Sequence, residues 1–331
     1  MEGACLEDQG ENRAFDLVSL GEILIDFTPA GRAPSGEALY QRNLGGGAVN
    51  LACAFASLGG RCAFIGKAGD DGFGRYCAEE LRARGVDVSG LILDKARGTT
   101  LAFVHVSDAG ERSFSFYRHG TADISLEIVD VDERAIRSSR AFHFGGVSLA
   151  GEPARSATLH AARAAKGAGL IVSYDPNLRL GLWRSAREAK GVLLEAFALA
   201  DVVKLSEEEA QFLFGRPDAG ALHEISRRYG TPLAIVTLAE RGAAALAGGR
   251  EYASPGRAAD VVDTTGAGDC FLSGALHCVL RSGKAPGELA PAEMERMLAF
   301  ANAAGSLVCT KMGAIAAQPS LAEVEGLMAG T

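Results

Sequence analysis

The stretch Asp263-Thr264-Thr265-Gly266-Ala267-Gly268-Asp269 leads into an apolar run from Cys270 to Leu280 that is typical of a buried helix. Small residues ahead of a helix leave the N–H groups of its first turn uncovered, and the helix dipole favours an anion there. Asp269 adds a carboxylate to that first turn. A proton acceptor beside an anion site indicates phosphoryl transfer. The alternative is a tight turn in which Asp269 only stabilises the helix start.

Around this motif, short apolar strands alternate with helices. Strands separated by helices predict a mostly parallel sheet with right-handed crossovers and helices on both faces. From residue 141 onward the predicted strands are 141–145, 170–174, 201–205 and 233–238, and the predicted helices are 153–167, 186–199, 206–214, 219–229, 267–281, 291–309 and 320–329.

The first third of the chain departs from this alternation. The apolar run from Asp16 to Asp26 predicts one buried strand that carries Asp26 at its carboxyl end. A helix of small residues is predicted from Gly45 to Gly59, followed by a strand at 62–66 and a helix at 73–84.

Two segments have no helix to cover them. Residues 28–43 are rich in turn formers, and residues 99–118 alternate as two strands around the turn Asp108-Ala109-Gly110. Together they predict a small sheet lying over the carboxyl edge of the main sheet. A lid is the role that such a sheet would serve.

In an open parallel sheet, ligands bind beyond the carboxyl ends of the strands. Several polar residues follow a predicted strand or open a predicted helix, so we expect them to gather at this edge. They are Asp26, Asn50, Arg179, Glu209, Thr237 and Asp269.

Composition narrows the class of protein. The 331 residues carry 33 basic and 41 acidic side chains, a net charge of −8, without a Lys/Arg run, which argues against nucleic-acid and anionic-membrane partners. The seven cysteines form no Cys-x-x-Cys pair, so no zinc site or disulfide framework is indicated. Residues 1–14 lack the features of a secretory signal and are predicted to form a disordered extension. A soluble cytoplasmic protein is expected.

Two longer signatures carry a family resemblance. They are Gly45-Gly46-Gly47-Ala48-Val49-Asn50, with Gly66 to Gly74 after it, and the motif Asp263 to Asp269. The sequence resembles the ribokinase-like, or PfkB, sugar kinases from Asp16 to about Pro319. The segments Ser173–Trp183, Val203–Glu209 and Phe116-Tyr117-Arg118 resemble the fructokinase branch.

The resemblance implies a ribokinase-like α/β fold, a doubly wound, mostly parallel sheet flanked by helices with a small β-sheet lid. It implies a single domain over 15–331, with the lid formed by about 28–43 and 99–118. The implied activity is transfer of the γ-phosphoryl group of ATP to a primary hydroxyl of a sugar, with D-fructose expected as the substrate.

Other activities stay open beside that one. Within the family these are 2-keto-3-deoxygluconate kinase and ribokinase, and outside catalysis a silent sugar-binding regulator. A dinucleotide-dependent oxidoreductase is disfavoured, because Gly45-Gly46-Gly47 lacks the Gly-x-Gly-x-x-Gly spacing between a strand and a helix.

For catalysis, the resemblance assigns Asp269 as the base that accepts the proton of the sugar hydroxyl. The proton moves late in phosphoryl transfer, so position matters more than a raised pKa. The N–H groups of Ala267, Gly268 and Asp269 would hold the transferred group, with Gly266 permitting its approach. Arg179 would lie near the substrate and phosphates, with a structural salt bridge as its alternative.

For the sugar, the resemblance assigns five residues. Asp26 would accept from two adjacent hydroxyls, with a strand-end cap as its alternative. Gly46, Gly47 and Asn50 would bind further hydroxyls, unless they form only a helix start. Arg118 would select the substrate from the lid, and an ordinary solvated arginine is the alternative.

The nucleotide and its ions complete the implied site. Lys204, Thr237, Gly242 and Asn302 would bind ATP, and Ala239 stands where the family has a glycine. Mg²⁺ would bind mainly to the ATP phosphates and to water, ordered by Glu209. Ser206 and Glu209 also fit a helix capping box, and both interpretations can hold together.

Two further partners are implied by the resemblance. Asp263 and Thr265 would hold an activating K⁺ with backbone carbonyls near Lys311 to Gly313. The lid sheets of two copies could pair into a homodimer through their exposed edges.

Overall fold

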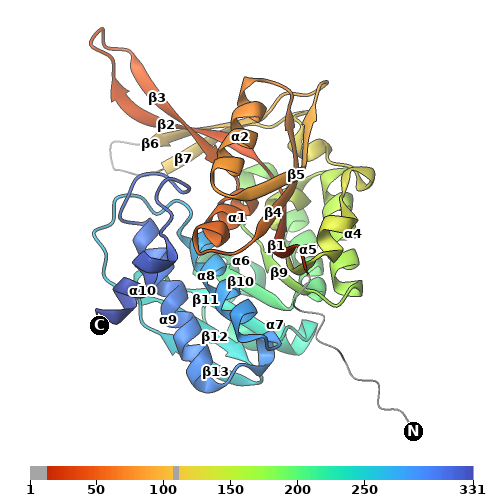
Figure 1. The fold of residues 1–331 in the computed structure, drawn as a ribbon, viewed down its shortest axis with the longest axis vertical. Coiled ribbons are helices and arrows are strands. Elements are labelled where there is room, and N and C mark those ends of the chain that lie inside the picture. Colours follow the sequence, from red (N-terminus) through yellow and green to blue (C-terminus); the bar gives the residue numbers. More distant parts are fainter. Residues whose placement is uncertain (1–12, 107–111, 331) are drawn as a thin grey trace.

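The computed structural model of the protein describes residues 13–106 and 112–330 (Figure 1). Its centre is a nine-stranded sheet with the order β13-β12-β11-β10-β9-β8-β1-β4-β5. The strands from β11 to β5 run parallel, and β12 and β13 are antiparallel at one edge. Their bounds are β1 Phe15–Leu20, β4 Cys62–Gly69, β5 Val86–Asp94, β8 Ser139–Gly145, β9 Ile171–Asp175, β10 Val202–Ser206, β11 Leu233–Thr237, β12 Ala243–Ala247 and β13 Arg250–Ser254.

Helices cover both faces of this sheet. One core cluster joins the sheet to α1 (Gly47–Ser57), α2 (Gly72–Ala83), α8 (Ala267–Ser282) and α9 (Pro291–Val308). The cluster on the other face joins it to α3 (Glu133–Arg137), α4 (Ala154–Gly167), α5 (Ala186–Ala196), α6 (Glu207–Phe214) and α7 (Ala219–Tyr229). The last helix, α10 (Leu321–Ala329), packs against α9.

The helix that follows the opening motif, α8, is buried almost throughout, because it contacts the sheet on one side and both α1 and α9 on others. A helix surrounded in this way has apolar residues on all its faces. This position explains the largely apolar run from Cys270 to Leu280. The predicted fold class, a mostly parallel sheet between two helical layers, is confirmed.

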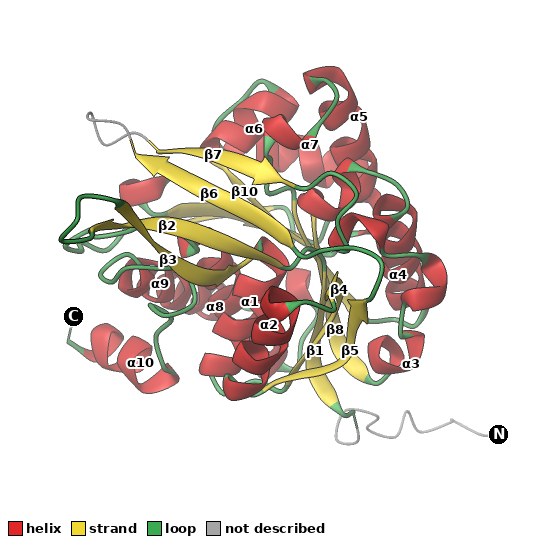
Figure 2. Cartoon of the chain, turned by 90° about the horizontal axis from the view of Figure 1, so that it is seen from above, coloured by secondary structure: helices red, strands yellow, loops and turns green. Residues whose placement is uncertain are grey.

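A second, four-stranded sheet has the order β3-β2-β6-β7 (Figure 2). Its strands are β2 (Leu24–Arg32), β3 (Ala38–Gly45), β6 (Thr100–Val106) and β7 (Arg112–Tyr117). Strands β2 and β3 are antiparallel, as are β6 and β7, while β2 and β6 are parallel. Figures 1 and 2 show this small sheet across one end of the body, above α1.

The prediction of one strand from Asp16 to Asp26 is wrong. Strand β1 ends at Leu20, the chain turns through residues 21–23, and Asp26 lies inside β2, in the other sheet. A β-carbon on Gly21 would come within 2.6 Å of Ala48 Cβ, so only glycine fits this turn beside α1. Apolar residues continue on both sides of the turn, so the pattern of apolar residues does not reveal where strand β1 ends.

The segment 28–43 forms most of a strand pair in the small sheet, so the prediction of a second sheet from 28–43 and 99–118 is confirmed. Strand β5 was missed after the predicted helix at 73–84. The turn at Asp108-Ala109-Gly110 and residues 1–12 of the predicted extension lie outside the described residues.

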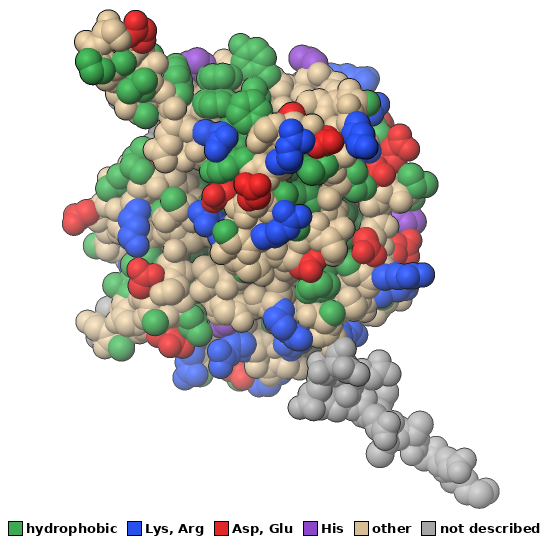
Figure 3. Space-filling model, turned by 45° about the horizontal axis from the view of Figure 1, so that its top comes forward, with side chains coloured by type: hydrophobic (Ala, Val, Ile, Leu, Met, Phe, Trp, Pro, Cys, Tyr) green, Lys and Arg blue, Asp and Glu red, His purple; other side chains and the backbone are tan. Residues whose placement is uncertain are grey.

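One face of the small sheet carries an aromatic cluster. The rings of Phe27 and Phe103 stack with centroids 4.9 Å apart, and Tyr40 and Tyr117 each meet Phe103 edge-on. Figure 3 shows apolar side chains gathered at the upper part of the surface that it views. Among the described residues, no helix combines the length and apolar character needed to cross a membrane.

Candidate active site

A cavity of about 380 Å³ lies between the small sheet and the start of α8. Most of the predicted site residues line it: Asp26, Gly46, Gly47, Asn50, Arg118, Arg179, Lys204, Glu209, Thr265, Gly266, Gly268 and Asp269. We call Lys204, Gly266, Gly268 and Asp269 the helix wall. We call Glu22, Asp26 and Arg118, which lie on or next to the small sheet, the sheet wall.

Asp269 lies in the first turn of α8, after the N-cap Gly266, whose φ of 80° is left-handed and favours glycine. Its Oδ2 accepts a hydrogen bond of 2.9 Å from Asn50 Nδ2 on α1. Burial raises the pKa of Asp269 to about 7, and the charge of Asp175 adds to this, while Asn50 and Lys204 oppose it. The carboxyl group therefore changes protonation near neutral pH.

Lys204 brings a buried positive charge to the same place. Its Nζ donates to Asp175 Oδ2 at 2.8 Å, and a β-carbon added at Gly268 would lie 2.9 Å from that nitrogen. Burial lowers the pKa of Lys204, but the charges of Asp175 and Glu209 raise it more, so the side chain stays protonated. The ammonium group therefore lies beside the start of α8.

The N–H groups of the first turn differ from one another. Ala267 N donates to Thr264 O at 3.2 Å, and Ala267 does not line the cavity. Gly268 and Asp269 are the second and third residues of the helix, so their N–H groups have no carbonyl within the helix to bind. Of the three predicted donors, these two are placed to receive an anion.

Asp26 belongs to the sheet wall and pairs in β2 with Asn43 of β3. Burial raises the pKa of its carboxyl to about 6, and the positive charge of Arg179 lowers it. The alternative role as a strand-end cap is wrong, because Asp26 is the third residue of a strand. A side chain at Gly45 would collide with its carboxylate, so the glycine leaves room for it.

Glu22 was missed in the sequence, although it is a carboxyl group within an apolar run. It is 3% exposed, Oε1 accepts from Gly47 N at 2.5 Å, and Oε2 is buried without a hydrogen-bond partner among the described residues. Burial raises the pKa of Glu22, and Arg118 opposes that shift. The amide of Gly47, predicted to bind sugar, is therefore bonded to Glu22.

The side-chain oxygen of Asn50 is a second hydrogen-bond acceptor of this kind. Its Oδ1 is buried and has no hydrogen-bond partner among the described residues. Glu22 and Asn50 both line the cavity. Because a buried polar atom without a partner is costly, two such acceptors in one cavity indicate a ligand that donates hydrogen bonds.

Arg118 follows β7 and is buried, which excludes the solvated alternative. Its Nε donates to Asp123 Oδ2 at 2.7 Å and its Nη1 to Val147 O at 3.2 Å. Arg179, in contrast, is exposed, and its side chain donates a hydrogen bond to the neighbouring Leu178 O at 3.1 Å. The alternative of a structural salt bridge for Arg179 finds no partner in the described chain.

Glu209 holds two backbone amides. Its Oε2 accepts from Ser206 N at 2.8 Å, Ser206 Oγ accepts from Glu209 N, and Oε1 accepts from Leu178 N at 2.7 Å. The capping-box interpretation is therefore confirmed. Both oxygens are engaged, and the described residues contain no group of three or more metal-ligating side chains. This arrangement fits a magnesium ion held by phosphates and water better than a direct protein cage.

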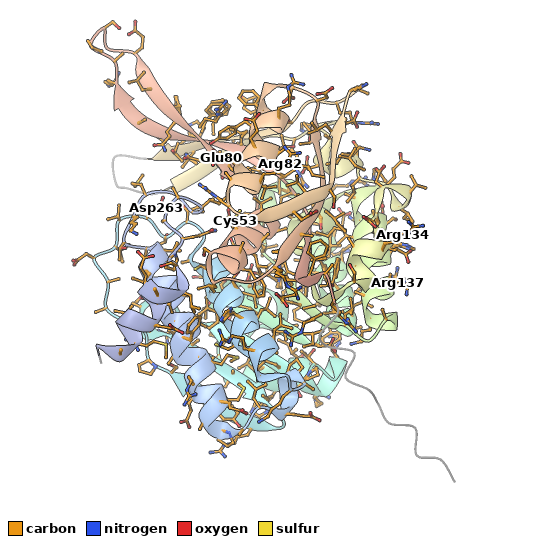
Figure 4. All side chains as sticks on the ribbon, viewed as in Figure 1. Cys53, Glu80, Arg82, Arg134, Arg137 and Asp263 are labelled. Carbon is orange, nitrogen blue, oxygen red and sulfur yellow. The ribbon has the colours of Figure 1, made fainter. Side chains whose placement is uncertain are left out.

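Asp263, which is labelled in Figure 4, binds both the opening motif and the 311–313 loop. Its Oδ1 accepts from Thr265 N at 2.9 Å and from Thr265 Oγ1 at 2.7 Å, and its Oδ2 accepts from Gly313 N at 3.0 Å. The predicted cation residues therefore lie together beside the 311–313 loop. Asp263 fastens the motif to that loop.

Of the predicted nucleotide residues, Lys204 lines the cavity, whereas Thr237, Gly242 and Asn302 do not. Gly242 and Asn302 both approach Ser254: a β-carbon on Gly242 would collide with Ser254 O, and Asn302 Nδ2 donates to the same oxygen at 3.3 Å. Thr237 ends β11 and donates to Leu205 O. Ala239 has a φ of 51°, the left-handed conformation that explains a glycine in the family pattern.

Comparisons with known proteins identify the family of the chain. Residues 14–321 match the model of the pfkB family of carbohydrate kinases. The probable fructokinase-4 of Arabidopsis thaliana is 42% identical, over 95% of this chain and 97% of that one.

Two solved structures are similar over nearly their whole length. A fructokinase with bound ATP from Xylella fastidiosa has a TM-score of 0.88 and 31% identity, covering 95% of this chain and 98% of that chain. A double mutant of the fructokinase of Vibrio cholerae O395, with bound fructose, ADP and potassium, has a TM-score of 0.85 and 32% identity, covering 96% and 99%.

Proposed function

The chain belongs to the pfkB family of carbohydrate kinases, and we propose that it transfers the γ-phosphoryl group of ATP to a primary hydroxyl of D-fructose. One observation supports this most directly. The carboxylate of Asp269, beside the anion-binding start of α8, shares a cavity with the hydroxyl-accepting groups of Glu22, Asp26 and Asn50. A phosphate and a sugar hydroxyl could therefore meet at Asp269.

Asp269 is the proposed base. A sugar hydroxyl in contact with its carboxylate passes its proton there as the bond to phosphorus forms. The N–H groups of Gly268 and Asp269 and the ammonium group of Lys204 stabilise the oxygens of the transferred group. Because these donors are fixed before substrate arrives, they need little rearrangement in the transition state.

The sugar is held by acceptors on the other side of the cavity. Asp26 accepts from adjacent hydroxyls, and Glu22 Oε2 and Asn50 Oδ1 gain hydrogen-bond donors that the described residues do not provide. The backbone at Gly46 and Gly47 sets the position of Asn50 one turn later on α1. A neutral polyhydroxyl molecule supplies the donors that this lining requires.

The nucleotide lies along the carboxyl ends of β10 and β11 in this proposal. Thr237, Gly242 and Asn302 shape the region for its nucleoside, and Arg179, at the mouth of the cavity, binds its phosphates. Mg²⁺ bound by the phosphates and by water, with Glu209 ordering that water, would neutralise phosphate charge. K⁺ beside Asp263 and Thr265 would steady the 311–313 loop.

Two assignments concern the whole molecule. The small sheet, about 28–43 and 99–118, serves as the lid of a single domain spanning 15–331. The aromatic cluster on its other face, where Tyr117 is 64% exposed, suits a homodimer contact. A cytoplasmic location is also part of the proposal.

A coupled assay of ADP release tests the function. Fructose, ribose, 2-keto-3-deoxygluconate and nucleosides are each offered with ATP and Mg²⁺, and fructose should give the highest kcat/KM. A preference for another sugar would contradict fructose as the substrate but would still support a sugar kinase. Binding of fructose without ADP release would instead favour the silent sugar-binding regulator.

A further inference from the structure

The guanidinium group of Arg118 reaches the cavity already paired with a carboxylate of its own chain. Arg118 Nε lies 2.7 Å from Asp123 Oδ2, and the Asp123 side chain is fully buried behind it. Two hydroxyl groups fix the other oxygen, since Thr100 Oγ1 and Thr121 Oγ1 donate to Asp123 Oδ1 at 2.5 and 2.9 Å. Asp123 is therefore held in one position.

A second carboxyl group lies on the cavity side of the same arginine. Glu22 interacts electrostatically with both Arg118 and Asp123, and Arg118 lowers the pKa of Glu22 against the effect of burial. Both Glu22 and Arg118 line the cavity, whereas Asp123 does not. Arg118 thus forms an ion pair with Asp123 and also interacts with the carboxyl group of Glu22.

We propose that the Arg118–Asp123 pair, with Glu22, sets the substrate class of the site by admitting neutral sugars and rejecting sugar acids. This inference rests on the proposed function. A carboxylate is the partner that a free arginine at a sugar site would bind, often through two parallel hydrogen bonds. Here Asp123 supplies that partner internally. A substrate carboxylate would therefore gain little from Arg118.

The same arrangement leaves a place for a hydroxyl group. Glu22 Oε2 has no hydrogen-bond partner among the described residues, so it can accept from a donor on the sugar. A carboxylate has no proton to donate and would leave that oxygen unpaired. Asp123 acts as a positioning residue, because it affects the substrate through Arg118.

The variant Asp123→Asn tests the proposal. The amide of asparagine keeps an oxygen that can accept from Thr100 and Thr121. It lacks the negative charge that pairs with Arg118 in the unaltered protein. We expect the ratio of kcat/KM for 2-keto-3-deoxygluconate to kcat/KM for fructose to rise by about tenfold or more, mainly through a lower KM for the acid. This rise should shrink with added salt, because it depends on charge.

Two further variants separate specificity from stability. Asp130→Asn breaks the 2.9 Å ion pair with Lys67, which does not line the cavity, and should leave the ratio unchanged. The double change Arg118→Leu with Asp123→Leu replaces a buried ion pair with apolar side chains, a change that proteins often tolerate. It should show no gain for the acid, since the guanidinium group is absent.

The outcomes are distinct. Equal losses on both sugars in Asp123→Asn, or an unaltered enzyme that phosphorylates 2-keto-3-deoxygluconate as well as fructose, would overturn the proposal. An unaltered enzyme that phosphorylates no sugar would overturn the proposed function instead. Calorimetric binding of 2-keto-3-deoxygluconate would then still decide the inference, since Asp123→Asn should bind it more tightly than the unaltered protein.

Discussion

The helix wall and the sheet wall of the cavity are built on different parts of the fold, and they differ in how their polar groups are paired. In the helix wall, Asp269 accepts from Asn50 and Lys204 donates to Asp175, so each charged group already has a partner. In the sheet wall, Glu22 keeps a buried oxygen without a hydrogen-bond partner among the described residues. The charged side chains of the helix wall are thus paired before a ligand arrives, whereas the sheet wall keeps a buried side-chain oxygen for the ligand to bind.

This difference fits the division of labour in a phosphoryl transfer between two substrates. Stabilising the charge that develops on a phosphoryl group requires donors fixed in advance, which α8 and β10 supply from the core of the molecule. Recognising a sugar requires acceptors that the sugar itself satisfies. Changes in the helix wall should therefore act on turnover, and changes in the sheet wall on sugar affinity.

The largest effect is expected for Asp269→Asn. The amide oxygen can still accept from Asn50 Nδ2, so the wall stays in place, but it cannot take up the proton of the hydroxyl. Turnover should fall about 10²–10⁴-fold, the usual contribution of a general base. Rates of ADP release measure the loss, and calorimetry should show fructose binding close to that of the unaltered enzyme. Undiminished turnover would exclude Asp269 as the base.

A smaller and different effect is expected for Asp26→Asn. Removing the charge from an acceptor of two hydroxyls should raise the KM for fructose about 10–100-fold, while the KM for ATP stays within about twofold. Initial rates over both substrates give the two constants. Thr28→Val is a control on the same strand, because Thr28 lies two residues further along β2 and does not line the cavity. Equal rises in both KM values would contradict the division between the walls.

The two walls also differ in how far the sequence predicts them. The helix wall is largely local: small residues, a carboxylate and an apolar helix follow one another from Asp263 to Leu280, and the structure keeps that order. Lys204 was expected near the nucleotide, but its nitrogen lies beside Gly268, about sixty residues away in the chain. Only the packing of α8 against β10 reveals that neighbour.

The residues of the sheet wall cannot be predicted from the pattern of apolar residues alone. The turn at Gly21 moves Asp26 from the large sheet to the small one, and the apolar run continues through it. Glu22 lies inside that turn. Its position as an acidic residue among apolar neighbours was the feature of the sequence that could have identified it as a site residue. The pairing of Arg118 with Asp123 follows from the path of the chain after β7, which the sequence does not specify.

The smallest expected effect is the pH dependence of the unaltered enzyme, which distinguishes the two carboxyl groups. The pKa of Asp269 is raised to about 7 and that of Asp26 to about 6, and Arg179 is what holds Asp26 lower. At pH 6 about a tenth of Asp269 and half of Asp26 should be ionised. With both substrates below their KM, kcat/KM should therefore fall by about tenfold or more between pH 8 and pH 6.

The thermal stability of the enzyme measured without substrates should fall as pH rises, whereas kcat/KM should increase. Both carboxyl groups have folded-state pKa values above their unfolded value of 3.8, so their contribution to stability is full below about pH 4 and is lost as pH rises through 6 and 7. Asp269→Asn cannot ionise, so its midpoint of thermal unfolding should rise relative to the unaltered enzyme from pH 5 to pH 8. A constant difference across that range would show that the pKa of Asp269 is not raised in the folded protein, which would contradict the pH dependence expected for kcat/KM.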